Sequence, residues 1–231
     1  MKQIILAAVL LAAGAAMAGQ GGNPQPDRSS KSPAFATIQE DPALPRVLLI
    51  GDSISVDYTL IVRKALQGKA NVLRIPENGG PTSRGVVAID KWLGDRKWDV
   101  IHFNWGLHDV KYVDGKNQVL IDDYEKNLRE LVKKLKATGA TLIWASTTPV
   151  PEGNLNPPRK SIDVVEYNAR AQKIMDEEKV TINNLYGVAL ERLKDLQIPV
   201  NVHFKANGSE VLGSKAAEAI TAALEKRAGK K

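Results

Sequence analysis

RVLLIGDSISVDY, residues 46–58, joins a short apolar run to a turn that ends in a serine. Val47 to Ile50 are continuously apolar, as expected of a strand that is covered on both faces. The run ends at Gly51-Asp52-Ser53, where a glycine permits a sharp turn into the helical segment that follows. Ser53 is therefore a candidate helix cap and also a candidate nucleophile.

Strand-like and helix-like segments alternate along the rest of the chain. Further short strands are predicted at 71–75, 99–104, 140–146 and 180–185. Helices are predicted at 58–67, 84–93, 121–136, 164–178, 188–194 and 210–226. Five strands separated by helices, without an internal repeat, predict an α/β fold: a three-layer α/β/α sandwich around a parallel five-stranded sheet.

The N-terminus has the pattern of a signal peptide. One lysine precedes a short apolar run, and Ala16-Met17-Ala18 matches the site that signal peptidase accepts. We expect residues 1–18 to be removed and the protein to be secreted or periplasmic, without a membrane anchor, because the apolar run is short. Residues 19–44 are rich in Gly, Pro, Ser, Asn and Gln and predict a flexible leader, so the folded domain is expected over 45–228.

Composition narrows the possible partners. The 231-residue chain is long enough for one full core, and without cysteine it cannot rely on disulfides for stability. The net charge is +6, but the basic residues are scattered over predicted helices without interleaved aromatics. Nucleic acid is therefore not an expected partner, whereas a modest preference for anionic substrates stays open.

Polar residues stand where the predicted strands end, which is where parallel α/β sheets bind ligands. Ser53 follows the first strand, the loop PENGGPTSRG follows the second, and FNWGLHD ends the third. Near the C-terminus, VHF places His203 before the last helix. Serine acyl transfer needs a nucleophile, an imidazole and donors for the oxyanion, and these loops offer all three.

A metal site is the weaker interpretation of the same residues. His102, His108, Asp109 and His203 match no standard zinc spacing, so no metal is expected. His102 lies inside the third strand and is interpreted as a structural residue.

Four blocks in order, IGDSIS, ENGGPTSRG, FNWGLHD and a terminal VHF before a helix, resemble those of the SGNH (GDSL-type) hydrolase family. The resemblance covers residues 46–224. It implies a flavodoxin-like parallel sheet, esterase chemistry that is often deacetylation of carbohydrates, and no metal or organic cofactor. The G-x-S-x-G elbow of the α/β-hydrolases is absent, because Ile54 and Ser55 follow Ser53.

The resemblance also implies roles for individual residues. Ser53 would be the nucleophile and would donate its own amide to the oxyanion. Gly80 would supply a second amide, with Gly79 as the fallback. His203 would act as general base and then as acid for the leaving alcohol.

The third block departs from the family pattern G-x-N-D. His108 occupies the position of the asparagine that donates to the oxyanion. Either His108 donates through a ring N–H, or Asn104 supplies an amide instead. We favour Asn104 here, because a neutral amide donates at every pH whereas an imidazole must be in the right tautomer.

The last block departs more strongly. Val200 stands where the family places the aspartate that orients the histidine. A main-chain carbonyl near Val200, the side chain of Asn201 or a more distant carboxylate such as Asp52 would have to hold the other ring nitrogen.

The predicted function is a secreted serine esterase that removes short acyl groups, most plausibly acetyl, from a carbohydrate or related ester. The loop 147–161 is long enough to be a binding element, and Trp105 is as consistent with stacking on a sugar as with the core. An acyltransferase on the same scaffold and a catalytically weakened carbohydrate-binding domain are the alternatives.

Overall fold

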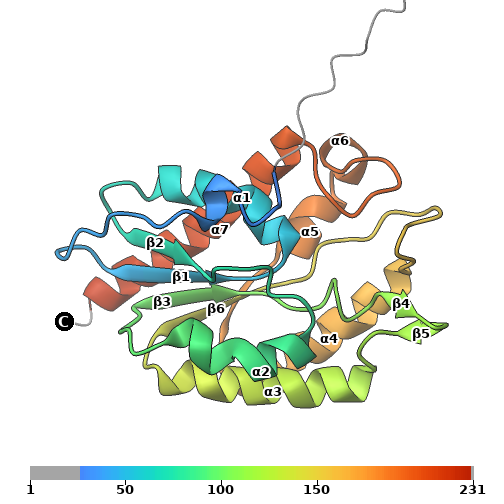
Figure 1. Cartoon of the computed structure of the whole chain (residues 1–231), viewed down its shortest axis with the longest axis horizontal. Helices are drawn as coiled ribbons and strands as arrows, with labels where there is room; N and C mark the ends of the chain where they lie inside the picture. The colour runs from blue at the N-terminus through green and yellow to red at the C-terminus, as the bar shows by residue number, and fades with distance from the viewer. Residues whose placement is uncertain (1–26, 230–231) are drawn as a thin grey trace, which may run out of the picture.

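The computed structural model describes residues 27–229, and its centre is one parallel β-sheet (Figure 1). The sheet has five strands in the order β2-β1-β3-β6-β7, and each neighbouring pair is parallel. Their bounds are β1 Arg46–Ile50, β2 Asn71–Arg74, β3 Val100–Phe103, β6 Thr141–Ala145 and β7 Thr181–Asn183. The predicted three-layer α/β/α fold with five parallel strands is thereby confirmed.

Helices cover both faces of this sheet (Figure 1). On one face, α1 (Ser53–Ala65) packs against α7 (Ala206–Ala228). On the other face lie α2 (Thr82–Leu93), α3 (Ile121–Ala137) and α4 (Ser161–Glu177). Two short helices, α5 (Leu185–Leu190) and α6 (Leu193–Leu196), precede the loop that leads into α7.

Apolar periodicity explains why the long helices form where they do. The predicted stripe on α3 is confirmed, since five residues four or three apart are buried against the sheet: Tyr124, Leu128, Leu131, Val132 and Leu135. The central strands β1 and β3 are buried along almost their whole length, which explains why β1 is apolar from Val47 to Ile50 and why β3 is apolar apart from His102.

The secondary structure departs from the prediction most clearly in three places. Helix α1 begins at Ser53, five residues before the predicted start, because the side chain of Asp52 accepts a hydrogen bond from the Ile54 amide and caps it. The predicted helix 188–194 is two helices, α5 and α6. A small antiparallel hairpin, β4 (Tyr112–Val113) with β5 (Lys116–Asn117), was not predicted because its strands are only two residues long.

The predicted flexible leader is wrong for its described part, residues 27–44. This segment contains a short 3₁₀ helix, η1 (Pro33–Phe35), which packs on α1, and its Asp41 is hydrogen-bonded to the side chain of Asn71 in β2. Arg63 donates to the carbonyls of Pro33 and Ala36, and the ring of Phe35 covers the guanidinium of Arg74. Side chains of the domain thus compensate for the low hydrophobicity of the segment. The predicted signal peptide, 1–18, and residues 19–26 of the predicted leader lie outside the described residues.

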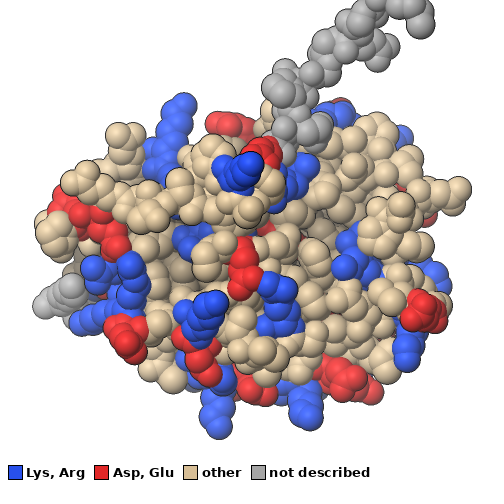
Figure 2. Space-filling model, viewed as in Figure 1, with Lys and Arg blue, Asp and Glu red and all other residues tan. Residues whose placement is uncertain are grey.

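Basic and acidic side chains alternate over the face shown in Figure 2, and no continuous basic patch covers it. Many of them form ion pairs, such as Arg129 with Glu125 and Glu177. Among residues 27–229, no helix combines the length and the apolar character that a membrane crossing requires.

Candidate active site

The turn after β1 leaves the hydroxyl of Ser53 free. Because Asp52 takes the capping role, Ser53 is the first residue of α1 and its side chain is not used by the helix. Glycine is required at position 51, since a Cβ there would lie 2.8 Å from the Ser55 hydroxyl oxygen. The cap and the nucleophile are therefore adjacent residues rather than two roles of one residue.

A half-buried arginine from β2, Arg74, supports this turn. Arg74 donates to the carbonyl oxygen of Gly51 at 3.0 Å and to the hydroxyl of Ser55 at 2.7 Å. It also reaches the Asp52 carbonyl and the hydroxyl of Thr59. Burial lowers the pKa of Arg74 to about 10, so the guanidinium stays charged at neutral pH.

His203 faces Ser53 from the loop before α7. The hydroxyl oxygen of Ser53 lies 2.9 Å from Nε2 of His203, although 150 residues separate them. This distance suits transfer of the serine proton to the ring. The structure thus brings together the two residues that the sequence assigned to nucleophile and base.

Asn201 fixes the tautomer of His203. The backbone N–H of His203 donates to Oδ1 of Asn201 at 2.9 Å, so the side-chain atom on this side must be the oxygen. The same oxygen lies 2.9 Å from Nδ1 of His203, so Nδ1 must carry the hydrogen. Nε2 is then unprotonated and accepts from Ser53, which is the arrangement a general base needs.

Neither of the other two candidates holds the ring. Nδ1 of His203 has its hydrogen bond with the side chain of Asn201 and not with a main-chain carbonyl near Val200, and the Val200 side chain lies against Gly153. Asp52 acts on His203 only through its charge, because its Oδ1 is bound by the Ile54 amide.

His203 is a weak base in this setting. Burial is the main cause that lowers its pKa to about 4, and the positive charge of Arg28 lowers it further. Asp52 opposes this shift by its negative charge. The imidazole is therefore neutral and ready to accept a proton at every pH well above 4.

In the glycine loop after β2, the amides of Gly79 and Gly80 have different hydrogen-bond partners. The amide of Gly79 donates to the carbonyl of Gly51 at 3.0 Å and is committed to the backbone. The amide of Gly80 donates instead to the side chain of Asn78, which lines the cavity at Ser53. Gly80 has a φ of 61°, a conformation that favours glycine. A ligand could accept a hydrogen bond from the Gly80 amide by displacing the side chain of Asn78.

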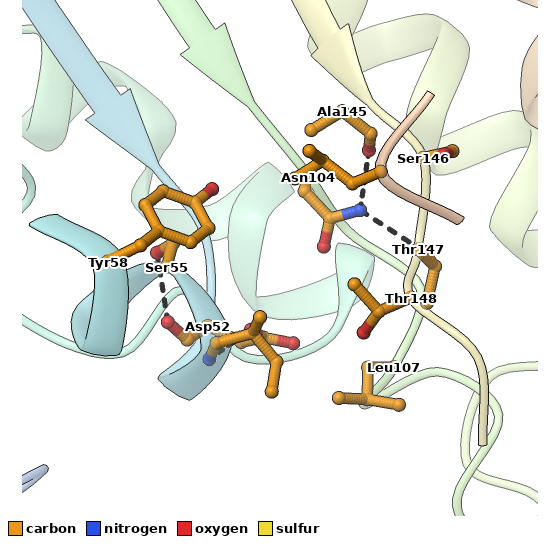
Figure 3. Close-up of a pocket in the computed structure, with 11 residues that line it drawn as sticks. Asp52, Ser55, Tyr58, Asn104, Leu107, Ala145, Ser146, Thr147 and Thr148 are labelled. Carbon is orange, nitrogen blue, oxygen red and sulfur yellow. Dashed lines mark hydrogen bonds between the residues drawn. The ribbon is translucent and has the colours of Figure 1, made fainter. Parts of the chain in front are cut away.

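Asn104 points away from this cavity. Its amide nitrogen donates to the Ala145 carbonyl at 2.7 Å and to the Thr147 hydroxyl at 3.1 Å, which uses both hydrogens (Figure 3). The preference for Asn104 over His108 is thereby corrected, because Asn104 joins β3 to β6. His108 instead lines the same cavity as Ser53 and His203.

Asp109, next to His108, ties the two donor loops together. Its Oδ1 accepts from the amide of Thr82 at 2.8 Å and from the Thr82 hydroxyl at 2.5 Å. Thr82 follows Gly80 by two residues, so this fully buried link fixes the glycine loop relative to His108. Burial raises the pKa of Asp109 to about 7.

The cavity at Ser53 and His203 has a volume of about 390 Å³. Three segments that are distant in the sequence supply its basic residues, which are Arg28, Lys111 and Arg159. Arg28 comes from the segment before the domain and pairs with Asp57 at 2.6 Å. Sequence reasoning missed Arg28, Arg74 and Lys111; the only signal was an arginine at the end of an otherwise apolar strand, NVLRI.

Trp105 and His102 are both core residues. Trp105 is 1% exposed and packs against Phe103 and Gly85, so the alternative of sugar stacking is excluded. His102 is 1% exposed and pairs with the side chain of Asn183, as the structural interpretation predicted. In the described part of the chain, no three His, Asp or Glu side chains are arranged to hold a metal ion.

No protein-family model matches this sequence, and no curated protein matches it by sequence. Solved structures do match. A lipase/acylhydrolase from Enterococcus faecalis superposes with a TM-score of 0.67 at 19% identity, covering 77% of this chain and 95% of that protein. The acetyl xylan esterase AlAXEase superposes with a TM-score of 0.66 at 16% identity, covering 76% and 99%.

A third match is a protein from Slackia heliotrinireducens that is provisionally assigned as an SGNH hydrolase. Its TM-score is 0.63 at 16% identity, and the match covers 77% of this chain and 99% of that protein. The chain therefore has the fold of the SGNH hydrolases, as the four sequence blocks predicted.

Proposed function

We propose that this protein is a serine esterase that hydrolyses short acyl esters, with Ser53 as nucleophile and His203 as base. The observation that carries the proposal is the contact of 2.9 Å between Ser53 and His203, with Asn201 imposing the tautomer that accepts a proton. The acetyl xylan esterase and the acylhydrolase that share this fold support ester hydrolysis.

The residues account for a complete reaction. The hydroxyl oxygen of Ser53 attacks the ester carbonyl, and its proton passes to Nε2 of His203. The bond to the alcohol then breaks, and the leaving oxygen takes that proton from Nε2. Water attacks the acyl-serine with its proton going to Nε2, and the acid is released as Ser53 regains its hydrogen.

The developing oxyanion would be stabilised by backbone amides and one ring. The amide of Ser53 lies at the start of α1, where helix amides lack intrahelical partners. The amide of Gly80 and a ring N–H of His108 are the further donors. Burial lowers the pKa of His108, so its ring would donate as a neutral tautomer.

Acetylated carbohydrates are the proposed substrates. A cavity of about 390 Å³ lies at the small end of ligand sites, which span about 300–1,000 Å³, and suits a short acyl group on a sugar-sized alcohol. The intact pair gives no support to a weakened binding domain, and no contact favours an acyl acceptor over water.

Comparison of Ser53→Ala with the wild type tests the function. Both proteins would be assayed on acetylated sugars and on short p-nitrophenyl esters. We expect the variant to lose at least about 10³-fold in kcat. Equal rates in the two proteins would remove Ser53 from the mechanism.

Export rests on the sequence pattern alone. We propose that the signal peptide is cleaved after Ala18 and that the protein works outside the cytoplasm. Intact mass and N-terminal sequence of the protein from the periplasm or medium test this. A full-length chain retained in the cytoplasm would contradict it.

A further inference from the structure

Two cationic side chains line the catalytic cavity without an acidic partner. Arg159 from the loop before α4 and Lys111 from the loop after β3 share the cavity with Ser53 and His203. Within residues 27–229, neither forms an ion pair, although thirteen such pairs occur in the same part of the chain.

Neutral acceptors hold Arg159 in place. Its Nε donates to the carbonyl oxygen of Leu107 at 2.8 Å, and Nη1 donates to that of Pro157 at 3.2 Å. Carbonyl groups fix the guanidinium but do not cancel its charge. The plane of the fork is thus set before any ligand arrives.

Lys111 lies close enough for its charge to interact with that of Arg159. Burial is the main cause that lowers the pKa of the Lys111 ammonium, and the positive charge of Arg159 lowers it further. Two like charges held near each other destabilise the folded protein, and such arrangements concentrate at sites that bind an opposite charge.

The nearest carboxylates act on these cations by charge and not by contact: Asp52 favours the charged form of Arg159, and Asp109 that of Lys111. Oδ1 of Asp52 accepts from the Ile54 amide, and Oδ1 of Asp109 accepts from Thr82, and both aspartates are buried. The third cation of the cavity, Arg28, is neutralised by Asp57, whose side chain is only 2% exposed. Of the three cations that line the cavity, Arg159 and Lys111 are therefore the two without an ion-pair contact to a described residue.

We propose that the ester substrate carries a carboxylate, which Arg159 and Lys111 bind beside the catalytic pair. The inference rests on the proposed esterase function and names its substrate class. A guanidinium fork matches a carboxylate in geometry, and an ammonium adds a second charge-assisted hydrogen bond. Arg159 donates to the carbonyl of Leu107, the residue before His108. The carboxylate would therefore lie near His108, the proposed oxyanion donor.

The carboxylate has two chemical sources, and matched ester pairs separate them. If it belongs to the alcohol, as in an acetylated acidic sugar, 4-acetoxybenzoate will be cleaved faster than neutral 4-acetoxybenzamide. If it belongs to the acyl group, monophenyl adipate will be cleaved faster than its neutral monoamide. Each pair differs by one charge at nearly constant shape.

We expect the wild type to prefer the acidic ester of one pair by about 10- to 100-fold in kcat/KM. Arg159→Gln and Lys111→Gln should each lower that ratio toward one, and added salt should lower it in the wild type. Lys160→Gln is the matched control, because Lys160 is exposed over the Tyr112 ring outside the cavity, and its ratio should not change.

Two results would overturn the inference in different ways. Equal rates within both pairs, with Ser53→Ala inactive, would reject the acidic substrate and leave the esterase intact. A preference that survives in both Arg159→Gln and Lys111→Gln would assign the charge recognition to other residues. Activity that persists in Ser53→Ala would instead reject the esterase function itself.

Discussion

The turn that carries Ser53 and the loop that carries His203 are built in opposite ways. The Ser53 turn is tied to buried groups: Arg74 binds the backbone beneath it, and Asp52 caps the helix. On the His203 side, one neutral side chain, Asn201, holds Nδ1 of the ring, and the loop contains Val200 in a left-handed conformation that a β-branched residue rarely adopts. The comparison teaches that the nucleophile is placed by the core, whereas the base is placed by a local loop contact.

Removing the single contact between Asn201 and His203 should greatly lower the rate of ester hydrolysis. Asn201→Ala leaves the tautomer of His203 unfixed, and we expect kcat to fall by about 10²- to 10³-fold. Because Asn201 is half-buried on a loop, the free energy of unfolding should change little. Ester kinetics with urea unfolding of the same samples check this, and an unchanged kcat would show that Asn201 does not position the ring.

His108, which stands where the family pattern has an asparagine, can be tested as an oxyanion donor in the same way. His108→Ala removes the ring donor and should lower kcat by about 10²-fold. His108→Asn restores the amide that the block pattern normally contains and should retain most of the activity. Equal losses in the two variants would mean that His108 acts by shape rather than as a donor.

A negative charge placed next to His203 should change the pH dependence of kcat/KM. The wild type should hold kcat/KM constant above about pH 5 and lose it as the pH falls through about 4, where His203 becomes protonated. In Asn201→Asp a carboxylate favours the charged ring, so the pKa of His203 should rise by about 1–3 units and the acidic limb should move up with it.

Val200→Asp is the matched control for that shift. It restores the aspartate at the family's usual position, but the side chain there faces Gly153 and solvent. We therefore expect its acidic limb to stay near that of the wild type. A shift as large as that of Asn201→Asp would mean that position 200 reaches the ring.

Removing a contact of the Ser53 turn should lower the free energy of unfolding. Arg74→Ala leaves the carbonyls of the buried residues Gly51 and Asp52 without this side-chain donor, and we expect a loss of about 3 kcal/mol in the free energy of unfolding. Arg96→Ala removes an exposed pair with Glu40 and should cost less than about 1 kcal/mol. Comparable losses in urea denaturation would show that Arg74 does not support the turn.

The sequence predicted what depends on local pattern. Apolar runs marked β1 and β3, the stripe on α3 marked its buried face, and the ordered blocks indicated Ser53 and His203. It also kept Asn201 among the groups that could hold the ring.

What the sequence did not predict depends on contacts between distant segments. Asn104 is bound to Ala145 and Thr147 across the sheet, which no spacing within one block reveals. Residues 27–44 look too polar to order themselves, and they are ordered by partners such as Arg63 and Arg74. Two-residue strands such as β4 and β5 are too short to produce a periodic signal.

Labelling with a fluorophosphonate tests the central claim most directly, since it requires no knowledge of the natural ester. A neutral His203 that accepts the Ser53 proton should make that hydroxyl reactive, so the wild type should gain one phosphonyl group, located at Ser53 by peptide mass spectrometry. Ser53→Ala should gain none, and Asn201→Ala should react more slowly. A folded wild type that remains unlabelled, or a label that persists in Ser53→Ala, would contradict the account.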